Sequence, residues 1–158
     1  YGTTLGYTHA GLFYTISAVS MIIIRMISKH FMDTVPAIKT MTGAVACGIL
    51  CCLMLLAAPY GEPVFLASGI FYGLATGISL PLNQSVAVKN TPPERWGAAN
   101  ALFLLANDIG IGFASVIWGV INDSFGFQTS IVCVIVCLIA SYASAWIVYP
   151  ARDKRWRH

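Results

Sequence analysis

Five long hydrophobic runs, separated by short polar or proline-containing segments, dominate the chain. They cover residues 8–28, 37–58, 64–87, 97–121 and 127–149. Each has at least the roughly 20 residues that an α-helix needs to cross the hydrocarbon core of a bilayer. A membrane β-barrel would instead show segments of about ten residues with alternating hydrophobicity. The pattern predicts an all-α membrane protein: residues 1–150 form a bundle of five transmembrane helices, and residues 151–158 form a basic tail.

The segments between the runs are short and contain residues that end helices. Proline lacks the backbone N–H that a helix interior uses, and it stands in three of these connections, at positions 36, 59, 63, 92 and 93. The fourth connection, residues 122–126, contains Asn and Gly, which tolerate turns. Because the connections are short, we expect neighbouring helices to run antiparallel.

The composition supports a chain embedded in lipid. Of its 158 residues, 58% are hydrophobic and 9% are charged, and the mean hydropathy is +0.76. A soluble domain carries about 25% charged residues. The net charge of +3 is too small to predict a nucleic-acid interface. The lipid bilayer is therefore the first expected partner.

The Lys and Arg residues are confined to certain connections between the hydrophobic runs and to the tail. All nine lie near the first connection, near the third or in the tail: Arg25, Lys29, Lys39, Lys89, Arg95, Arg152, Lys154, Arg155 and Arg157. The opposite side carries only Glu62 and Asp123 as charged residues. Because cytoplasmic loops carry the excess of Lys and Arg, we expect the first side and the C-terminus to be cytoplasmic. An odd number of helices that starts outside, with Tyr1 in place of Met, is expected of a fragment.

Three stretches resemble a known family. Residues 12–25 are similar to the eighth helix of a major facilitator superfamily transporter, and residues 91–100 are similar to the loop before its eleventh helix. The Asp-x-Gly-x-Gly pattern from Asp108 to Gly112, followed by Trp118 and Gly119, resembles bacterial drug and small-molecule efflux members. The resemblance implies helices eight to twelve of a twelve-helix fold, which would be the C-terminal half of the carrier.

This resemblance also implies a function. The chain would belong to a carrier in the bacterial inner (cell) membrane that moves a small organic solute by alternating access, as proton-coupled efflux. Its partners would be the solute and the missing N-terminal half of the same transporter. The alternative is a non-transporting membrane scaffold or receptor, or a channel subunit.

The first cytoplasmic connection departs from the family pattern. Members often carry Gly-x-Leu-x-Asp-Arg-x-Gly there, whereas residues 29–36 keep only the acid, Asp33. Asp33 and Arg25 are candidate gating residues of the loop: Asp33 would pair with Arg25 or Lys29 or cap a helix end, and a solvated loop acid is the other interpretation.

Asp108 is the one acid deep in a predicted helix. An unpaired charge there is costly, so the side chain should face protein or water. Three interpretations stay open: proton coupling, attraction of a cationic substrate, or a cap or bond to a helix outside this chain. Gly112 and Gly119 share its helix face at spacings of about one turn, so this face is a candidate for close packing.

The third run carries two further patterns. Gly69, Gly73 and Gly77 recur every four residues, which is typical of closely packed membrane helices. On an adjacent face lie hydrogen-bonding residues, of which we select as solute-cavity candidates Tyr72, Thr76 and Asn83. Packing against other helices is the alternative for these three. Pro81 is a candidate gating joint because proline frees a backbone carbonyl.

No pattern predicts an enzyme, a cofactor or a metal. Catalysis needs convergent groups at one depth. The histidines lie at positions 9, 30 and 158, far from Asp108 along the chain, and all five cysteines fall inside hydrophobic runs. We interpret these cysteines as small packing residues.

Overall fold

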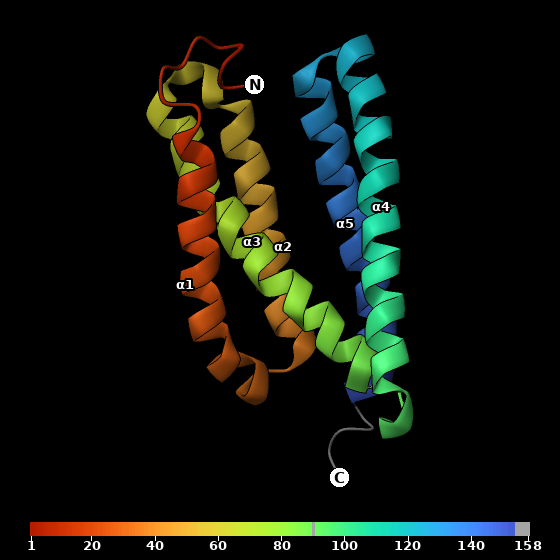
Figure 1. Ribbon diagram of the computed structural model, residues 1–158. Helices are drawn as coiled ribbons and strands as arrows, with labels where there is room; N and C mark the ends of the chain where they lie inside the picture. The colour runs from red at the N-terminus through yellow and green to blue at the C-terminus, as the bar shows by residue number, and fades with distance from the viewer. Residues whose placement is uncertain (90, 154–158) are drawn as a thin grey trace.

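The computed structural model describes residues 1–89 and 91–153, with side chains left undescribed at 29–34 and 147–153. Its five helices are α1 (Leu12–Thr34), α2 (Ala37–Leu56), α3 (Glu62–Lys89), α4 (Trp96–Phe125) and α5 (Phe127–Asp153). Two 3-10 turns, Ala58–Tyr60 and Pro93–Arg95, lie in the connections. Figure 1 shows the helices running up and down, with successive helices antiparallel.

The predicted all-α membrane bundle is confirmed. Within the described residues, four segments are long and apolar enough to cross a membrane: Ala37–Leu56, Glu62–Lys89, Pro93–Phe125 and Phe127–Trp146. In α1, the part with described side chains, Leu12–Ser28, is also apolar but is shorter than these four segments.

The start of α1 differs from the expected position near residue 8. Residues 1–11 form turns because contacts with the far side of the α2–α3 connection hold them. The backbone N–H of His9 donates to Glu62 Oε1 at 2.8 Å, and the Tyr7 hydroxyl donates to the carbonyl of Ala58. The helix then continues to Thr34, past the expected end near Ser28.

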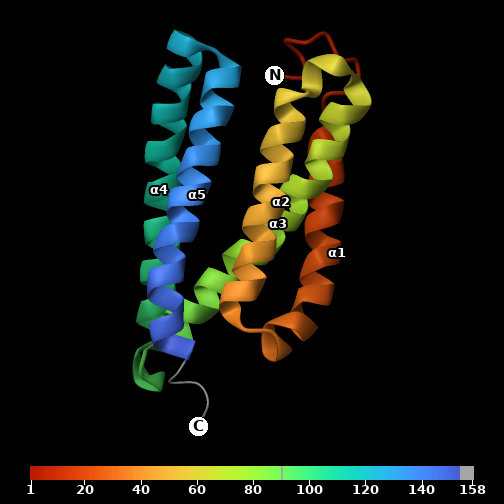
Figure 2. The ribbon, with the colours of Figure 1, turned by 180° about the vertical axis from the view of Figure 1, so that it is seen from behind.

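The helices form two groups. Figures 1 and 2 show α1, α2 and α3 together on one side, and the α4–α5 hairpin on the other. The lower half of α3 crosses diagonally toward the foot of α4. Residues of α2 contact α5, and residues of α3 contact α4, so the two groups meet through these pairs.

Glycines hold α3 against α1. A Cβ built on Gly69 would lie 3.0 Å from the Phe13 carbonyl oxygen, and one on Gly73 would fall on the carbonyl oxygen of Ser17. A Cβ on Gly77 would meet the side chain of Ile24. The missing side chains therefore let the two backbones approach closely, as small residues do in membrane helix pairs.

Contacts between α2 and α5 are partly polar. Met41, Val45 and Leu82 form a small buried cluster, against which Tyr142 packs. The hydroxyl of Tyr142 lies 2.8 Å from Thr42 Oγ1 and accepts a hydrogen bond from Trp146 Nε1 at 3.0 Å. This short network ties the two groups of helices together.

Candidate functional site

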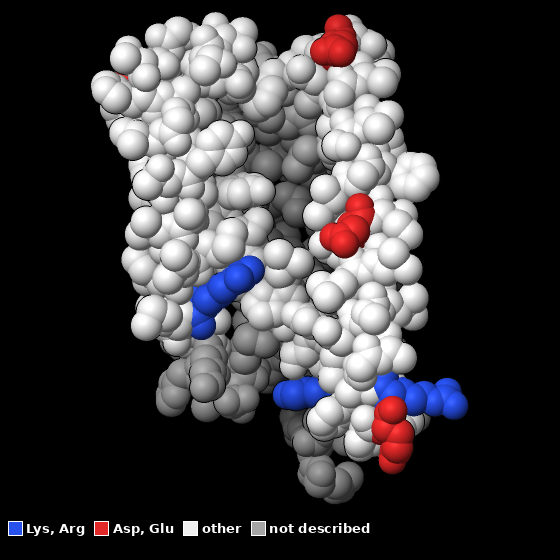
Figure 3. Space-filling model, in the orientation of Figure 1, with Lys and Arg blue, Asp and Glu red and all other residues white. Residues whose placement is uncertain are grey.

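A cavity of about 660 Å³ lies between the two groups of helices. Its walls come from α2, α3, α4 and α5, and Tyr1 and Phe127 line one end, where their rings stack with centroids 3.7 Å apart. Figure 3 shows the corresponding hollow in the surface between the groups. The residues that line it, all in the described part of the chain, are uncharged.

Two of the three solute-cavity candidates line this cavity. Tyr72 and Thr76 reach it from α3, together with Ser79, whereas Asn83 is not among the lining residues. Tyr72 is 46% exposed, and its ring centroid lies 6.0 Å from that of Phe13 on α1. Thr76 Oγ1 donates to the Tyr72 carbonyl at 2.8 Å. The α3 wall thus presents a phenol and the hydroxyls of Thr76 and Ser79 to a mostly apolar space.

Pro81 lies inside α3, and the helix continues past it to Lys89. Because Pro81 has no N–H, the carbonyl one turn earlier, at Gly77, lacks its usual helical donor. Below the proline, Gln84 Nε2 donates to Asn100 Oδ1 of α4 at 2.5 Å. Sequence reasoning missed this bond because nothing in the spacing of two polar residues on different helices marks them as partners.

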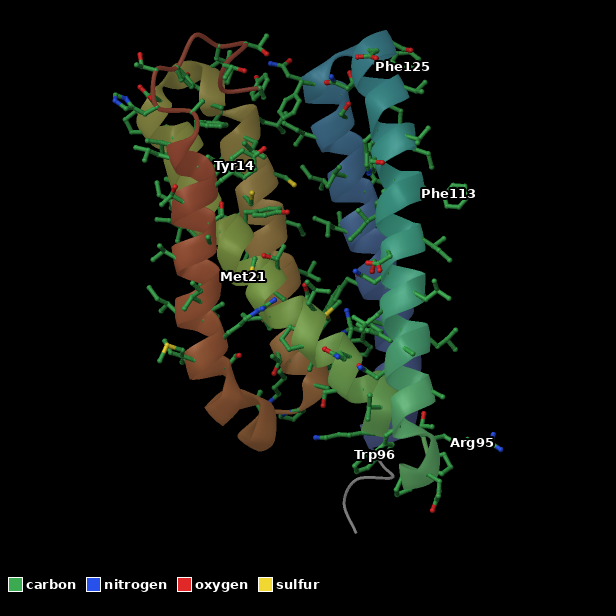
Figure 4. The ribbon with its side chains drawn as sticks, in the orientation of Figure 1. Tyr14, Met21, Arg95, Trp96, Phe113 and Phe125 are labelled. Atoms are coloured by element: carbon green, nitrogen blue, oxygen red, sulfur yellow. The ribbon has the colours of Figure 1, made fainter. Side chains whose placement is uncertain are left out.

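Asp108 lies on α4, which packs against α5 and α3 but has no buried residue among those described. The Asp108 side chain is exposed. No hydrogen bond or ion pair to it occurs among the described residues. A Cβ on Gly112 or Gly119 would meet no described atom within 4 Å. Phe113, 69% exposed, points away from the rest of the chain in Figure 4.

The two candidates near the first connection are placed differently. Arg25 is exposed on α1, and the helix continues beyond it to Thr34, so Arg25 lies within the helix and not in the loop. The side chain of Asp33 lies outside the described residues, as do those of the basic tail. The gating pair therefore stays a prediction.

The cysteines are free thiols, and Cys51 and Cys52 line the cavity from α2. Within the described part of the chain, no three His, Cys, Asp or Glu side chains form a group that could hold a metal ion.

Comparison with known proteins identifies the family of this helical bundle. The whole chain, residues 1–158, matches the family model of the Major Facilitator Superfamily. The chain belongs to the Major Facilitator Superfamily. This superfamily member is also 26% identical over 158 residues to the Staphylopine export protein of Staphylococcus aureus (strain Mu50 / ATCC 700699). The matched part is 96% of this chain and 40% of that relative's length. No solved structure matches the chain.

Membership in the Major Facilitator Superfamily confirms the resemblance drawn from residues 12–25, 91–100 and 108–119. Together with the apolar helices, it makes the chain a multi-pass membrane protein.

Proposed function

We propose that this chain is part of a secondary active carrier that exports a small organic solute across the bacterial cell membrane by alternating access. The observation that carries the proposal is the family match over the whole chain, combined with an unpaired carboxylate on a transmembrane helix that has no buried residue among those described. The direction of transport is proposed from the relative, whose name describes export.

Asp108 is the proposed proton-coupling residue. A carboxylate in hydrocarbon is costly while it is charged and unpaired, so protonation and exposure to water are coupled at this position. A carrier can use that coupling when its two halves rock and the acid faces each side in turn. Proton entry would then drive solute export.

The solute contacts are proposed on α3. Tyr72 and Thr76 line the cavity and offer hydroxyl groups to a solute, and Asn83 lies two turns further along the same helix. A cysteine placed at Tyr72 should react with a soluble thiol reagent in at least one transport state. A cysteine that never reacts would assign Tyr72 to packing between helices.

The partners and orientation complete the proposal. The lipid bilayer surrounds the bundle, the N-terminal half of the same carrier covers the exposed face of α4, and nucleic acid has no part. The first and third connections lie at one end of the bundle, with Lys39, Lys89 and Arg95 in or next to them along the chain, and would face the cytoplasm with the C-terminus. Glycosylation tagging of the α2–α3 connection tests this orientation.

The test of function uses the complete carrier in proteoliposomes. Staphylopine is the first solute to try, because the relative is named for its export. Wild type should show counterflow of labelled solute, which a scaffold or channel would not. Asp108→Asn should abolish uphill transport driven by a proton gradient, whereas Asp123→Asn, at the exposed end of α4, should retain it. Full gradient-driven transport by Asp108→Asn would exclude the coupling role.

A further inference from the structure

Arg25 places a permanent positive charge deep inside α1. Nine residues separate it from the end of the helix at Thr34, which is about 14 Å at 1.5 Å per residue. The side chain is exposed, and no hydrogen bond or ion pair to its guanidinium occurs among the described residues. A guanidinium does not lose its proton, so this charge is costly in hydrocarbon unless water, protein or a solute surrounds it.

The contact between α1 and α3 gives the depth of Arg25. A Cβ on Gly77 would meet the side chain of Ile24, the residue next to Arg25. The two helices run in the same direction (Figure 1), so Arg25 lies near the depth of the α3 turn around Gly77. Thr76, one of the proposed solute contacts, belongs to that turn.

Asp108 lies near the same depth on α4. The hydrogen bond from Gln84 to Asn100 brings α3 and α4 level with each other. Asp108 is eight residues above Asn100, and Thr76 is eight residues above Gln84 on its own helix, about 12 Å in each case. An acid and a base thus lie close to the depth of the same α3 turn.

The two charges also lie on one side of the molecule. Figure 3 shows a basic side chain over α1 and an acidic one over the middle of α4 on the same face. Arg25 is the only Lys or Arg among the described side chains of α1, and the other acid of α4, Asp123, lies two residues before the helix ends. In carriers built from two halves, the solute and coupling-ion sites lie near the midplane where the halves meet.

We propose that Arg25 binds an oxyanion group of the solute, a carboxylate or a phosphate. The inference rests on the proposed export function and names the chemical class of its solute, a small organic anion. A guanidinium presents a planar fork of N–H donors that matches two oxygens of such a group. The bound group neutralises Arg25, and the hydroxyl of Thr76 lies near enough in depth to contact the rest of the solute.

An acid of the other half of the carrier is a poorer partner for Arg25. A fixed ion pair at this depth would hold the two halves together, whereas alternating access needs contacts that separate. Separation of such a pair would leave an uncompensated charge in a place of low polarity. A solute supplies the opposite charge only while it is bound. The helix itself offers no closer acid, because Asp33 lies eight residues further on, about 12 Å along the axis.

Stabilisation of the complete carrier by anions tests the proposal. The midpoint of thermal unfolding in detergent is measured with sodium succinate, sodium glutamate or sodium phosphate, each against sodium chloride at equal ionic strength. A molecule that binds only the folded state raises this midpoint. We expect at least one of the three anions to raise the midpoint of the wild-type carrier by a few degrees, and Arg25→Gln to lose that shift. A response to succinate or glutamate assigns a carboxylate, and a response to phosphate alone assigns a phosphate.

Two further variants control for charge and for folding. Arg95→Gln removes an exposed cation that points away from the bundle in Figure 4, so it should keep the shift. Arg25→Lys keeps the charge but loses the planar fork, so it should keep part of the shift. A merely structural role for Arg25 would not make the response to anions depend on the side chain in this way.

Two outcomes would overturn the proposal. One is a wild-type midpoint that responds to none of the three anions, and if Arg25→Gln then lowers the midpoint in chloride, Arg25 pairs with the other half. The other is an equal shift in the wild type and in Arg25→Gln. The measurement needs neither transport nor a proton gradient. A carrier that exports its solute without any anion response would therefore contradict this inference alone, and a carrier that responds through Arg25 but does not transport would contradict only the proposed function.

Discussion

The α1–α3 pair and the α4 helix carry similar small-residue patterns in very different surroundings. Gly69, Gly73 and Gly77 lie against the backbone or side chains of α1, whereas Gly112 and Gly119 on α4 face no described atom within 4 Å of an added Cβ. Two buried glycine positions on α3 would place a methyl group directly on α1 atoms. On α4 the same residue type lies open.

Glycine spacing along a helix therefore indicates which face can pack closely, but it does not identify the helix that packs there. In lipid, helices associate through close packing and hydrogen bonds, since hydrocarbon gives no hydrophobic driving force. The glycine face of α3 packs against α1 of the same chain. The part of the α4 face that carries Asp108 and Gly112 meets no described partner, which is why we propose that the other half of the carrier covers it, whereas Gly119 lines the cavity within the chain.

The largest loss of stability is expected when the contact between α1 and α3 is disrupted. Gly73→Ala puts a methyl group on the Ser17 carbonyl oxygen and 2.8 Å from Ser20 Cβ, and backbone atoms yield only if the whole helix shifts. We expect the free energy of unfolding to fall by about 1–3 kcal/mol, the usual cost of overpacking. Unfolding in mixed detergent micelles measures it.

Gly43→Ala is the matched control, because an added Cβ there meets no described atom within 4 Å. Gly43→Ala should leave the free energy of unfolding unchanged or raise it slightly. Equal destabilisation by the two substitutions would mean that contact with α1 is not the cause of the loss at Gly73.

A smaller effect is expected at the link between the two groups. Tyr142→Phe removes the hydroxyl shared by Thr42 Oγ1 and Trp146 Nε1 while keeping the ring. Only the bond to Thr42 joins two helices, and hydrogen bonds between membrane helices contribute about 0.6 kcal/mol on average, so the loss should be about 0.6 kcal/mol. Unfolding in the same micelles measures it, with Ser144→Ala as control.

The hydroxyl of Ser144 donates within its own helix, to the Ser141 carbonyl, so Ser144→Ala should cost less than Tyr142→Phe. If the two variants lose the same stability, the network does not tie α2 to α5.

Sequence alone predicted the helices well because the length of an apolar run decides whether it can cross a bilayer. It placed the start of α1 too early, since the turns of residues 1–11 depend on Glu62 and Ala58, far along the chain. Spacing grouped Asn83 with Tyr72 and Thr76, yet Asn83 is not among the residues that line the cavity. Such outcomes depend on how helices cross, which local patterns do not encode.

The smallest change in stability is expected for a substitution on α4, and it tests whether the Gly112 face contacts another part of the carrier. Gly112→Ala adds a methyl group that meets no described atom within 4 Å, and alanine favours the helix over glycine by up to about 1 kcal/mol in water. In the 158-residue chain the substitution should therefore be neutral or stabilise by a few tenths of a kcal/mol. In the complete carrier the same methyl group would enter the contact with the other half, so the midpoint of unfolding should fall. A neutral result in both proteins would show that Gly112 faces lipid throughout, and the assignment of the α4 face to the other half of the carrier would then fail at this position.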